Sequence, residues 1–263
     1  MTLPRLPIEM ITIALQNGAN METHTILLTY PMQNFLYAIG PTAHRLLLYI
    51  LSFFKIPSKI SADIDLSRYL SMTGTSVRRL GNYITMIKGL QSRNNDSMIS
   101  MFSRCHINYV QKSLEIELNE SYIMEFINQF TIPITIPDTV LCLRKHSEYK
   151  DVLRIAIGIS QKYNRRKRFP MEIKMPITIF LDGCNNQRWR SQTVPDLIVR
   201  FNALKDRRFI DGWYVLDGDN EPIHFNCSNE RQNALRQRLM RSWTHFTGAD
   251  IVFEVSPSSW RKQ

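Results

Sequence analysis

Two apolar segments with helical spacing lie far apart in this 263-residue chain, and a similar succession of elements follows each. The first covers residues 41–55 (PTAHRLLLYILSFFK), where Pro41 suits the first turn of a helix. The second covers residues 148–164 (EYKDVLRIAIGISQKYN). After each helix we predict a short strand, a short helix, a turn, a second helix and a hairpin. A repeat of this order confines the chain to an α+β fold built from two similar units.

In the first unit the predicted strand lies in residues 59–67, and the short helix that follows lies in residues 66–72. A turn with Gly74 then leads into a helix whose apolar residues follow helical spacing: Val77, Leu80, Ile84, Ile87 and Leu90. Residues 97–104 and 106–119 alternate in polarity and predict the two strands of a hairpin. Residues 1–33 predict a strand or an extended arm.

The second unit begins after residues 121–145, which predict a linking helix and a proline-bearing connector. Its remaining segments are, in chain order, a basic loop (165–169), a strand (171–175), a short helix assigned by position (176–185), a helix (191–207), a hairpin (209–226) and a basic C-terminal helix (228–246). A helix-turn-helix followed by a hairpin is the order of a winged helix. The predicted fold is therefore α+β, with two winged-helix domains in tandem at residues 1–136 and 137–263.

The net charge of +10 is unevenly distributed. Residues 1–140 hold 11 Lys+Arg and 10 Asp+Glu, whereas residues 141–263 hold 22 Lys+Arg and 13 Asp+Glu. A basic half favours a polyanionic partner, with nucleic acid ahead of a membrane surface. The alternative is that the basic charge serves solubility alone.

The sequence offers little to an enzymatic interpretation. It has no phosphate-binding glycine loop, nucleophile elbow or paired-histidine zinc motif. The four cysteines are widely spaced and form no Cys-x-x-Cys pair, so we expect free thiols, no metal and no cofactor. No apolar run approaches the length of a membrane span, and we expect a cytoplasmic protein that is not an enzyme.

The chain resembles the tandem winged-helix replication initiators of plasmids, which bind repeated origin sites called iterons. The resemblance is carried by residues 44–53 (HRLLLYILSF), 65–87 (DLSRYLSMTGTSVRRLGNYITMI) and 148–163 (EYKDVLRIAIGISQKY), and covers about residues 35–245 as element order and apolar pattern. The second unit departs from the family in a longer loop after its first helix and in residues 180–190 (FLDGCNNQRWR).

The resemblance implies a protein that binds double-stranded DNA at plasmid origin repeats and recruits host replication proteins. It implies a homodimer or a monomer–dimer equilibrium. In that family the first unit commonly serves dimerisation, with auxiliary DNA contact, and the second dominates recognition. The charge distribution of this chain agrees with that division.

Sixteen side chains are candidates for DNA contact, because cations bind phosphates and polar groups at a helix N-terminus can reach base edges. In the second unit they are Arg188, Arg190, Ser191, Gln192, Thr193, Arg200, Lys205, Arg207, Arg208 and the run Arg165, Arg166, Lys167, Arg168. In the first unit they are Arg78, Arg79 and Lys88. We expect the long helix to begin near Thr193, with Arg188 and Arg190 on an extended approach to the phosphates and Gln192, Thr193 and Arg200 nearer the bases. A solvated surface is the alternative for each single residue.

Two other functions remain open from the sequence. One is a transcriptional repressor built from the same winged-helix modules. The other is a protein-interaction module whose basic half binds an acidic protein.

Overall fold

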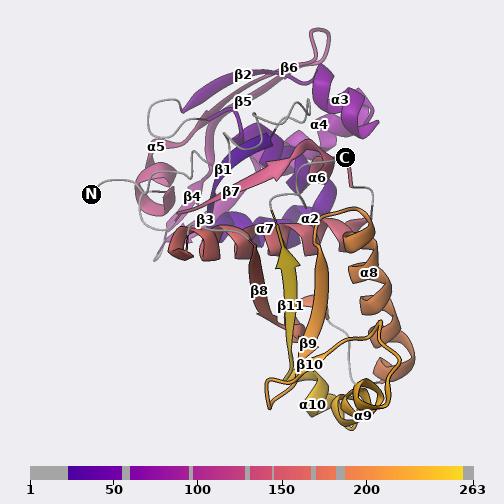
Figure 1. Cartoon of the computed structure of the whole chain (residues 1–263). Helices are drawn as coiled ribbons and strands as arrows, with labels where there is room; N and C mark the ends of the chain where they lie inside the picture. Colours follow the sequence, from indigo (N-terminus) through magenta and orange to yellow (C-terminus); the bar gives the residue numbers. More distant parts are fainter. Residues whose placement is uncertain are drawn as a thin grey trace. The chain divides into compact units, whose positions relative to one another are not determined.

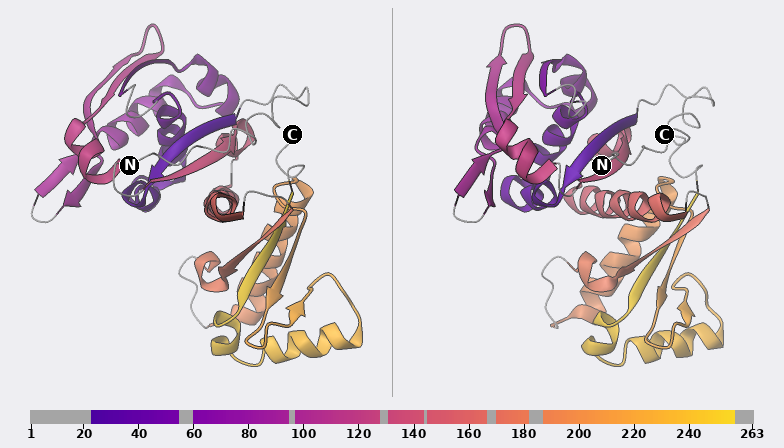
Figure 2. Two further views of the ribbon diagram at one scale, coloured as in Figure 1. Left: turned by 60° about the vertical axis from the view of Figure 1, so that its left-hand side comes forward. Right: turned by 90° about the vertical axis from the view of Figure 1, so that its left-hand side faces the viewer.

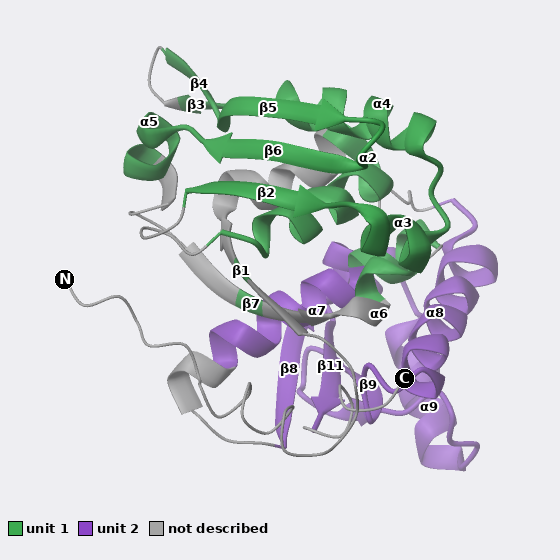
Figure 3. Ribbon diagram, turned by 90° about the horizontal axis from the view of Figure 1, so that it is seen from above, with its two compact units in different colours: residues 1–6, 22–150 green, residues 7–21, 151–263 purple. Residues whose placement is uncertain are grey.

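The computed structural model describes residues 23–54, 60–94, 97–127, 131–143, 145–166, 170–181 and 187–256. Within these ranges the fold is a mixture of helices and antiparallel sheets, as predicted for the α+β class (Figure 1). The described chain divides into two compact units, one ending at Lys150 and the other beginning at Asp151 (Figure 3).

The helices of the first unit follow the predicted order. α2 (Tyr30–Leu51) is interrupted at Gly40, so a helical stretch begins again at Pro41, as its sequence predicts. α3 (Ser67–Thr73) and α4 (Val77–Lys88) follow β2 (Ser61–Asp65). The apolar spacing predicted for α4 is confirmed, since Leu80, Ile84 and Ile87 are buried.

A three-stranded sheet in the order β2-β6-β5 supports these helices, with β5 at Phe102–Asn108 and β6 at Ser113–Leu118. One face of the sheet buries Ala62, Ile64, Leu114 and Ile116, and α2 and α4 lie behind it in Figure 3. The hairpin turn between β5 and β6 is at residues 109–112, inside the segment that we predicted to be one strand. The preceding residues form a separate hairpin of β3 (Gln91–Asn94) and β4 (Ser97–Ser100).

Two strands far apart in sequence complete the first unit. β1 (Thr23–Thr29) pairs antiparallel with β7 (Thr131–Pro137), which we predicted to be part of a connector. Before β7 the chain forms α5 (Glu120–Tyr122) and a π-helical turn, η1 (Ile123–Ile127), and after it α6 (Asp138–Leu141). Pro133 and Pro137 made this segment look unlike a strand, because proline cannot donate to a sheet ladder; it is tolerated at an edge.

The division between the two compact units falls inside α7 (His146–Arg166), between Lys150 and Asp151, and the domain boundary between residues 136 and 137 stays a prediction. The first turn of α7 belongs to the first unit because Tyr149 is fully buried there and its hydroxyl lies 2.7 Å from Nδ1 of His44. Asp151 packs instead within the second unit.

In the second unit α7 leads to β8 (Met171–Pro176), a 3-10 helix η2 (Ile177–Phe180), a π-helical turn η3 (Trp189–Thr193) and α8 (Val194–Asp206). β9 (Gly212–Leu216) and β10 (Pro222–Ile223) form the predicted hairpin. The single C-terminal helix that we predicted is wrong. The segment contains two helices, α9 (Glu230–Leu239) and α10 (Trp243–Thr247), and β11 (Asp250–Val255) follows them.

β11 lies between β9 and β8, so the sheet order is β10-β9-β11-β8 (Figure 2). The core between α8 and this sheet is aromatic. The ring of Phe201 lies 5.2 Å from that of Phe253 and 5.3 Å from those of Phe180 and Trp213, in edge arrangements that aromatic pairs prefer. Phe201 therefore fixes α8 on the sheet.

Replacing Phe201 with alanine should destabilise the second unit by about 3–5 kcal/mol, because the ring is fully buried and its removal leaves a cavity. Chemical denaturation measures the change. Val199→Ala is the matched control, since Val199 is two residues away on α8 but 65% exposed. We expect the control to change stability by less than about 0.5 kcal/mol. Equal effects of the two variants would contradict this packing.

Candidate nucleic-acid interface

The N-terminal end of α8 is anchored by Trp189. Its ring stacks on Phe246 at 5.0 Å between centroids and meets Trp243 edge-on at 5.6 Å. The chain enters helical conformation at this tryptophan, with Arg188 in the left-handed region (φ 57°). α8 itself begins at Val194, near Thr193 as predicted, with Pro195 in its first turn. The residues before it form the π-helical turn η3 and not the extended approach that we expected for Arg190.

Arg190 bonds to the protein itself. Its Nε donates to the carbonyl of Met240 at 3.0 Å, and a terminal nitrogen donates to the carbonyl of Arg241 at 2.7 Å. Met240 is the C-cap residue of α9, and Arg241 follows it. Arg190 thus ties the start of η3 to the end of α9, although its side chain, like that of Arg188, is exposed.

The polar residues that follow divide into two groups. Ser191 and Gln192 are exposed, but Thr193 is buried. Gln192 is therefore accessible to a partner, while Thr193 faces the interior of the unit.

Arg200 lies in a different environment from the base-reading position that we expected. Its side chain is only 10% exposed, and its guanidinium donates to both carboxylate oxygens of Asp151 at 2.7 and 2.8 Å. It also contacts Asp196 at 3.2 Å and the carbonyl of Phe180 at 3.3 Å. Burial alone lowers the pKa of Arg200, but the two carboxylates raise it by more, so the group stays charged. These contacts make Arg200 a packing residue between α7, η2 and α8.

Cations also lie at the C-terminal end of α8. Lys205, Arg207 and Arg208 are exposed there, and Arg208 takes a left-handed backbone conformation (φ 59°). The exposed positions of α8 before Lys205 include Asp196 and Val199, and Asp206 is the last residue of the helix. Exposed positive charge in this helix is thus concentrated at the ends.

The basic run before β8 is described only in part. Arg165 and Arg166 form the end of α7, while Lys167 and Arg168 lie outside the described residues. The phosphate-contact role of the run stays a prediction.

The arginines of α9 hold the hairpin next to it. Arg238 pairs with Asp217, with Asp219 at 3.3 Å and with Glu221 at 2.7 Å, and Arg231 reaches Glu221 at 3.5 Å. Hydrogen bonds to Asp217 and Glu221 raise the pKa of Arg238. Much of the positive charge in this part of the second unit is therefore neutralised within the chain. Sequence reasoning did not single out these pairs, because they join segments about twenty residues apart.

In the first unit Arg78 and Arg79 are exposed in the first turn of α4 and Lys88 in its last turn. Ser76 caps the helix by accepting from the backbone N–H of Arg79 at 3.4 Å. The three cations predicted for this unit thus lie on one helix.

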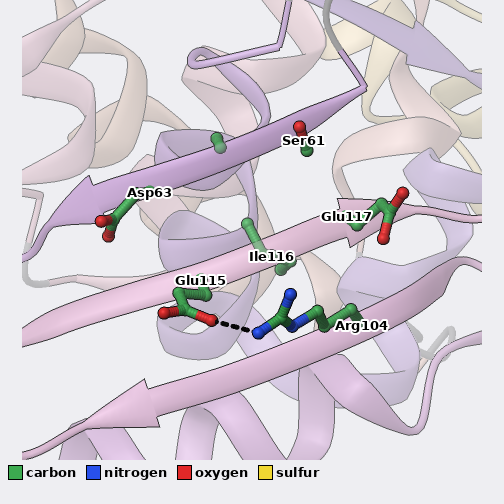
Figure 4. Close-up of a pocket in the computed structure, with 7 residues that line it drawn as sticks. Ser61, Asp63, Arg104, Glu115, Ile116 and Glu117 are labelled. Atoms are coloured by element: carbon green, nitrogen blue, oxygen red, sulfur yellow. Dashed lines mark hydrogen bonds and ion pairs between the residues drawn. The ribbon is translucent and has the colours of Figure 1, made fainter.

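A shallow depression marks the open face of the first unit's sheet (Figure 4). Asp63, Glu115 and Glu117 line it, and Arg104 pairs with Glu115 at 2.6 Å. Carboxylates on this face would repel phosphates, so it is unsuited to DNA.

The fold of the chain is similar to a solved initiator structure. That structure is of Pi initiator protein in complex with iteron DNA, and it matches with a TM-score of 0.58 at 10% sequence identity. The match covers 88% of this chain and 97% of that chain. No family model and no curated protein matches the sequence. At this identity the likeness shows the fold.

The described ranges contain no candidate metal site and no candidate membrane span. No group of three or more His, Cys, Asp or Glu side chains there is placed to hold a metal ion. No helix in the same ranges combines the length and the apolar character needed to cross a membrane.

Arg200→Met should destabilise the protein by about 3 kcal/mol, because Asp151 is fully buried and would lose its bidentate partner. Lys205→Met, the same kind of change at an exposed position of α8, is the control and should have little effect. Thermal unfolding compares the two. If Arg200→Met kept its stability and lost only its discrimination between DNA sequences, Arg200 would instead be a residue that contacts bases.

Proposed function

We propose that this protein binds double-stranded DNA in a sequence-specific manner and initiates plasmid replication by binding repeated origin sites. The observation that carries the proposal is the likeness to an initiator protein in complex with iteron DNA, which spans 97% of that chain. A match that covers 88% of this chain extends over both compact units rather than over one common module.

The proposal interprets each unit as a winged helix. In the first unit α2, β2, α3 and α4 precede the β5–β6 hairpin, which is the order of that module. In the second, α7, β8, η2 and α8 precede β9, and the partner strand β11 comes only after an insertion of β10, α9 and α10. The second wing is thus formed by strands that are not consecutive.

The mechanism requires binding and no catalysis by the chain itself. Exposed cations such as Arg188 and Lys205 neutralise phosphates and set the affinity, while groups that reach base edges set the register on each repeat. Occupation of several repeats deforms the origin and recruits host replication proteins. We further propose a homodimer in equilibrium with monomers, located in the cytoplasm.

A gel-shift with the DNA that flanks the gene tests the proposal. Binding to a repeated site supports an initiator, whereas binding to a single palindrome at the promoter supports a repressor. Binding without sequence preference that is lost at moderate salt supports a protein-interaction module whose basic half holds nucleic acid only weakly.

DNA affinity should fall steeply with salt, because bound lysine and arginine displace condensed counterions. If about five phosphates are neutralised, a plot of log affinity against log salt should have a slope of about −4 to −5. Titrations at several salt concentrations measure it. A slope near zero contradicts the electrostatic contribution.

Arg188→Ala should make this slope shallower by about one, since Arg188 is exposed immediately before the first residue of η3. Arg190→Ala is a matched comparison, because its guanidinium holds the carbonyls of Met240 and Arg241. We expect Arg190→Ala to lower the melting temperature and to leave the slope nearly unchanged. The same change of slope in both variants would show that Arg190, too, contacts a DNA phosphate.

A further inference from the structure

The outward face of α4 carries polar and basic side chains and no carboxylate. Its exposed positions are Arg78, Arg79, Asn82, Thr85, Met86 and Lys88, and Leu80, Ile84 and Ile87 face the core. At 100° per residue, Asn82 lies opposite the centre of the buried stripe, with Arg78 one turn before it and Met86 one turn after it. Asn82 is thus the most outward group of the helix.

The first half of the chain has nearly equal numbers of acidic and basic residues, but in the first unit the two kinds lie on different sides. The carboxylates of Asp63, Asp65, Glu115 and Glu117 are on strands β2 and β6, at alternate positions to the buried side chains that face the helices. The cations of α4 are on the other side of that apolar layer. A polyanion can therefore approach α4 without meeting the acidic face.

The turn before α4 is short and rigid. α3 ends at Gly74, which takes the left-handed backbone conformation (φ 64°). Ser76, two residues later, caps the start of α4. Helices joined by a three-residue turn that contains glycine are typical of helix-turn-helix DNA-binding modules. In those modules the N-terminal residues of the second helix contact base edges in the major groove.

The tip of the β5–β6 hairpin is held against the same helix. A Cβ atom at Gly81 would lie 2.6 Å from the hydroxyl of Tyr109, so the tyrosine side chain at the tip packs directly on the helix backbone. Val110 at the tip is 92% exposed, and Lys112 beside it is exposed too. The tip of the hairpin therefore lies beside α4 through Tyr109.

α8 of the second unit has few exposed side chains that could bind the edge of a base. Its exposed side chains include two carboxylates, Asp196 and Asp206, and one cation, Lys205. Its central arginine is buried on Asp151, and Thr193, just before the helix, is buried as well. The exposed cations near α8 lie at the two ends of the helix.

We propose that α4 of the first unit discriminates between DNA sequences, and that Asn82 binds an adenine in the major groove. The Asn82 carboxamide would accept from the adenine N6 amino group and donate to N7, which is the pairing that asparagine geometry favours. The second unit supplies salt-dependent affinity through phosphates. The inference rests on the proposed DNA binding and makes it specific by assigning discrimination to the unit with the smaller net charge.

The experiment uses the full chain and a duplex that it selects from a randomised pool. Each adenine of that duplex is then replaced in turn by 7-deazaadenine, which lacks the N7 acceptor. At one adenine the wild-type protein should lose about tenfold in affinity, and Asn82→Ala should lose no more on the modified than on the unmodified duplex. Because Asn82 is exposed, the variant should keep the wild-type melting temperature.

Gln237→Ala on α9 is the matched control, since it removes another exposed carboxamide and should leave the adenine preference intact. An equal effect of 7-deazaadenine on the wild type and on Asn82→Ala overturns the inference. Loss of the adenine preference in Gln192→Ala but not in Asn82→Ala also overturns the inference. That result would show that the second unit discriminates between DNA sequences. Failure of the wild type to enrich any sequence would instead contradict the proposed function.

Discussion

The contact on which the second unit depends is the ion pair between Asp151 and Arg200. The carboxylate of Asp151 is fully buried on α7, and a buried charge is tolerated only when a partner compensates it. Arg200 supplies the partner from α8 and also donates to the last carbonyl of η2. One guanidinium therefore fixes α7, η2 and α8 against each other. The direction of Val199 follows from it, since Val199 projects from the helix that Arg200 anchors.

The sequence predicted what local patterns determine. The helical spacing of Leu80, Ile84 and Ile87 identifies α4 without any knowledge of its partners, and Pro41 marks the true start of a helix. Strand partners are determined by contacts between distant segments. β11 pairs with β8 and β9, and β1 pairs with β7, so neither pairing has a signal in the neighbouring residues. The basic segment before β11 resembled one helix because the break at Met240–Ser242 contains neither glycine nor proline.

The candidate site was harder to predict than the fold, because a count of charges does not show which charges are paired. Arg190, Arg200, Arg236 and Arg238 add to the net charge of the second half, yet all four bind carbonyls or carboxylates inside that unit. In the first half the opposite holds. Nearly equal numbers of acidic and basic residues suggested that the first unit binds DNA weakly. The carboxylates of β2 and β6, however, lie on the opposite side of the apolar layer from the cations of α4. Burial and pairing, and not the net charge of a segment, decide which cations can meet a phosphate.

This separation bears on how affinity and discrimination respond to salt. Phosphate contacts release counterions and weaken as salt rises, whereas a hydrogen-bonded carboxamide carries no net charge and releases none. If Arg188 and its neighbours supply affinity while Asn82 supplies discrimination, salt reduces binding to every sequence by a similar factor. The ratio between cognate and unrelated DNA then changes little. A chain with its discriminating group in the less charged unit can therefore release DNA without first losing its ability to recognise the site.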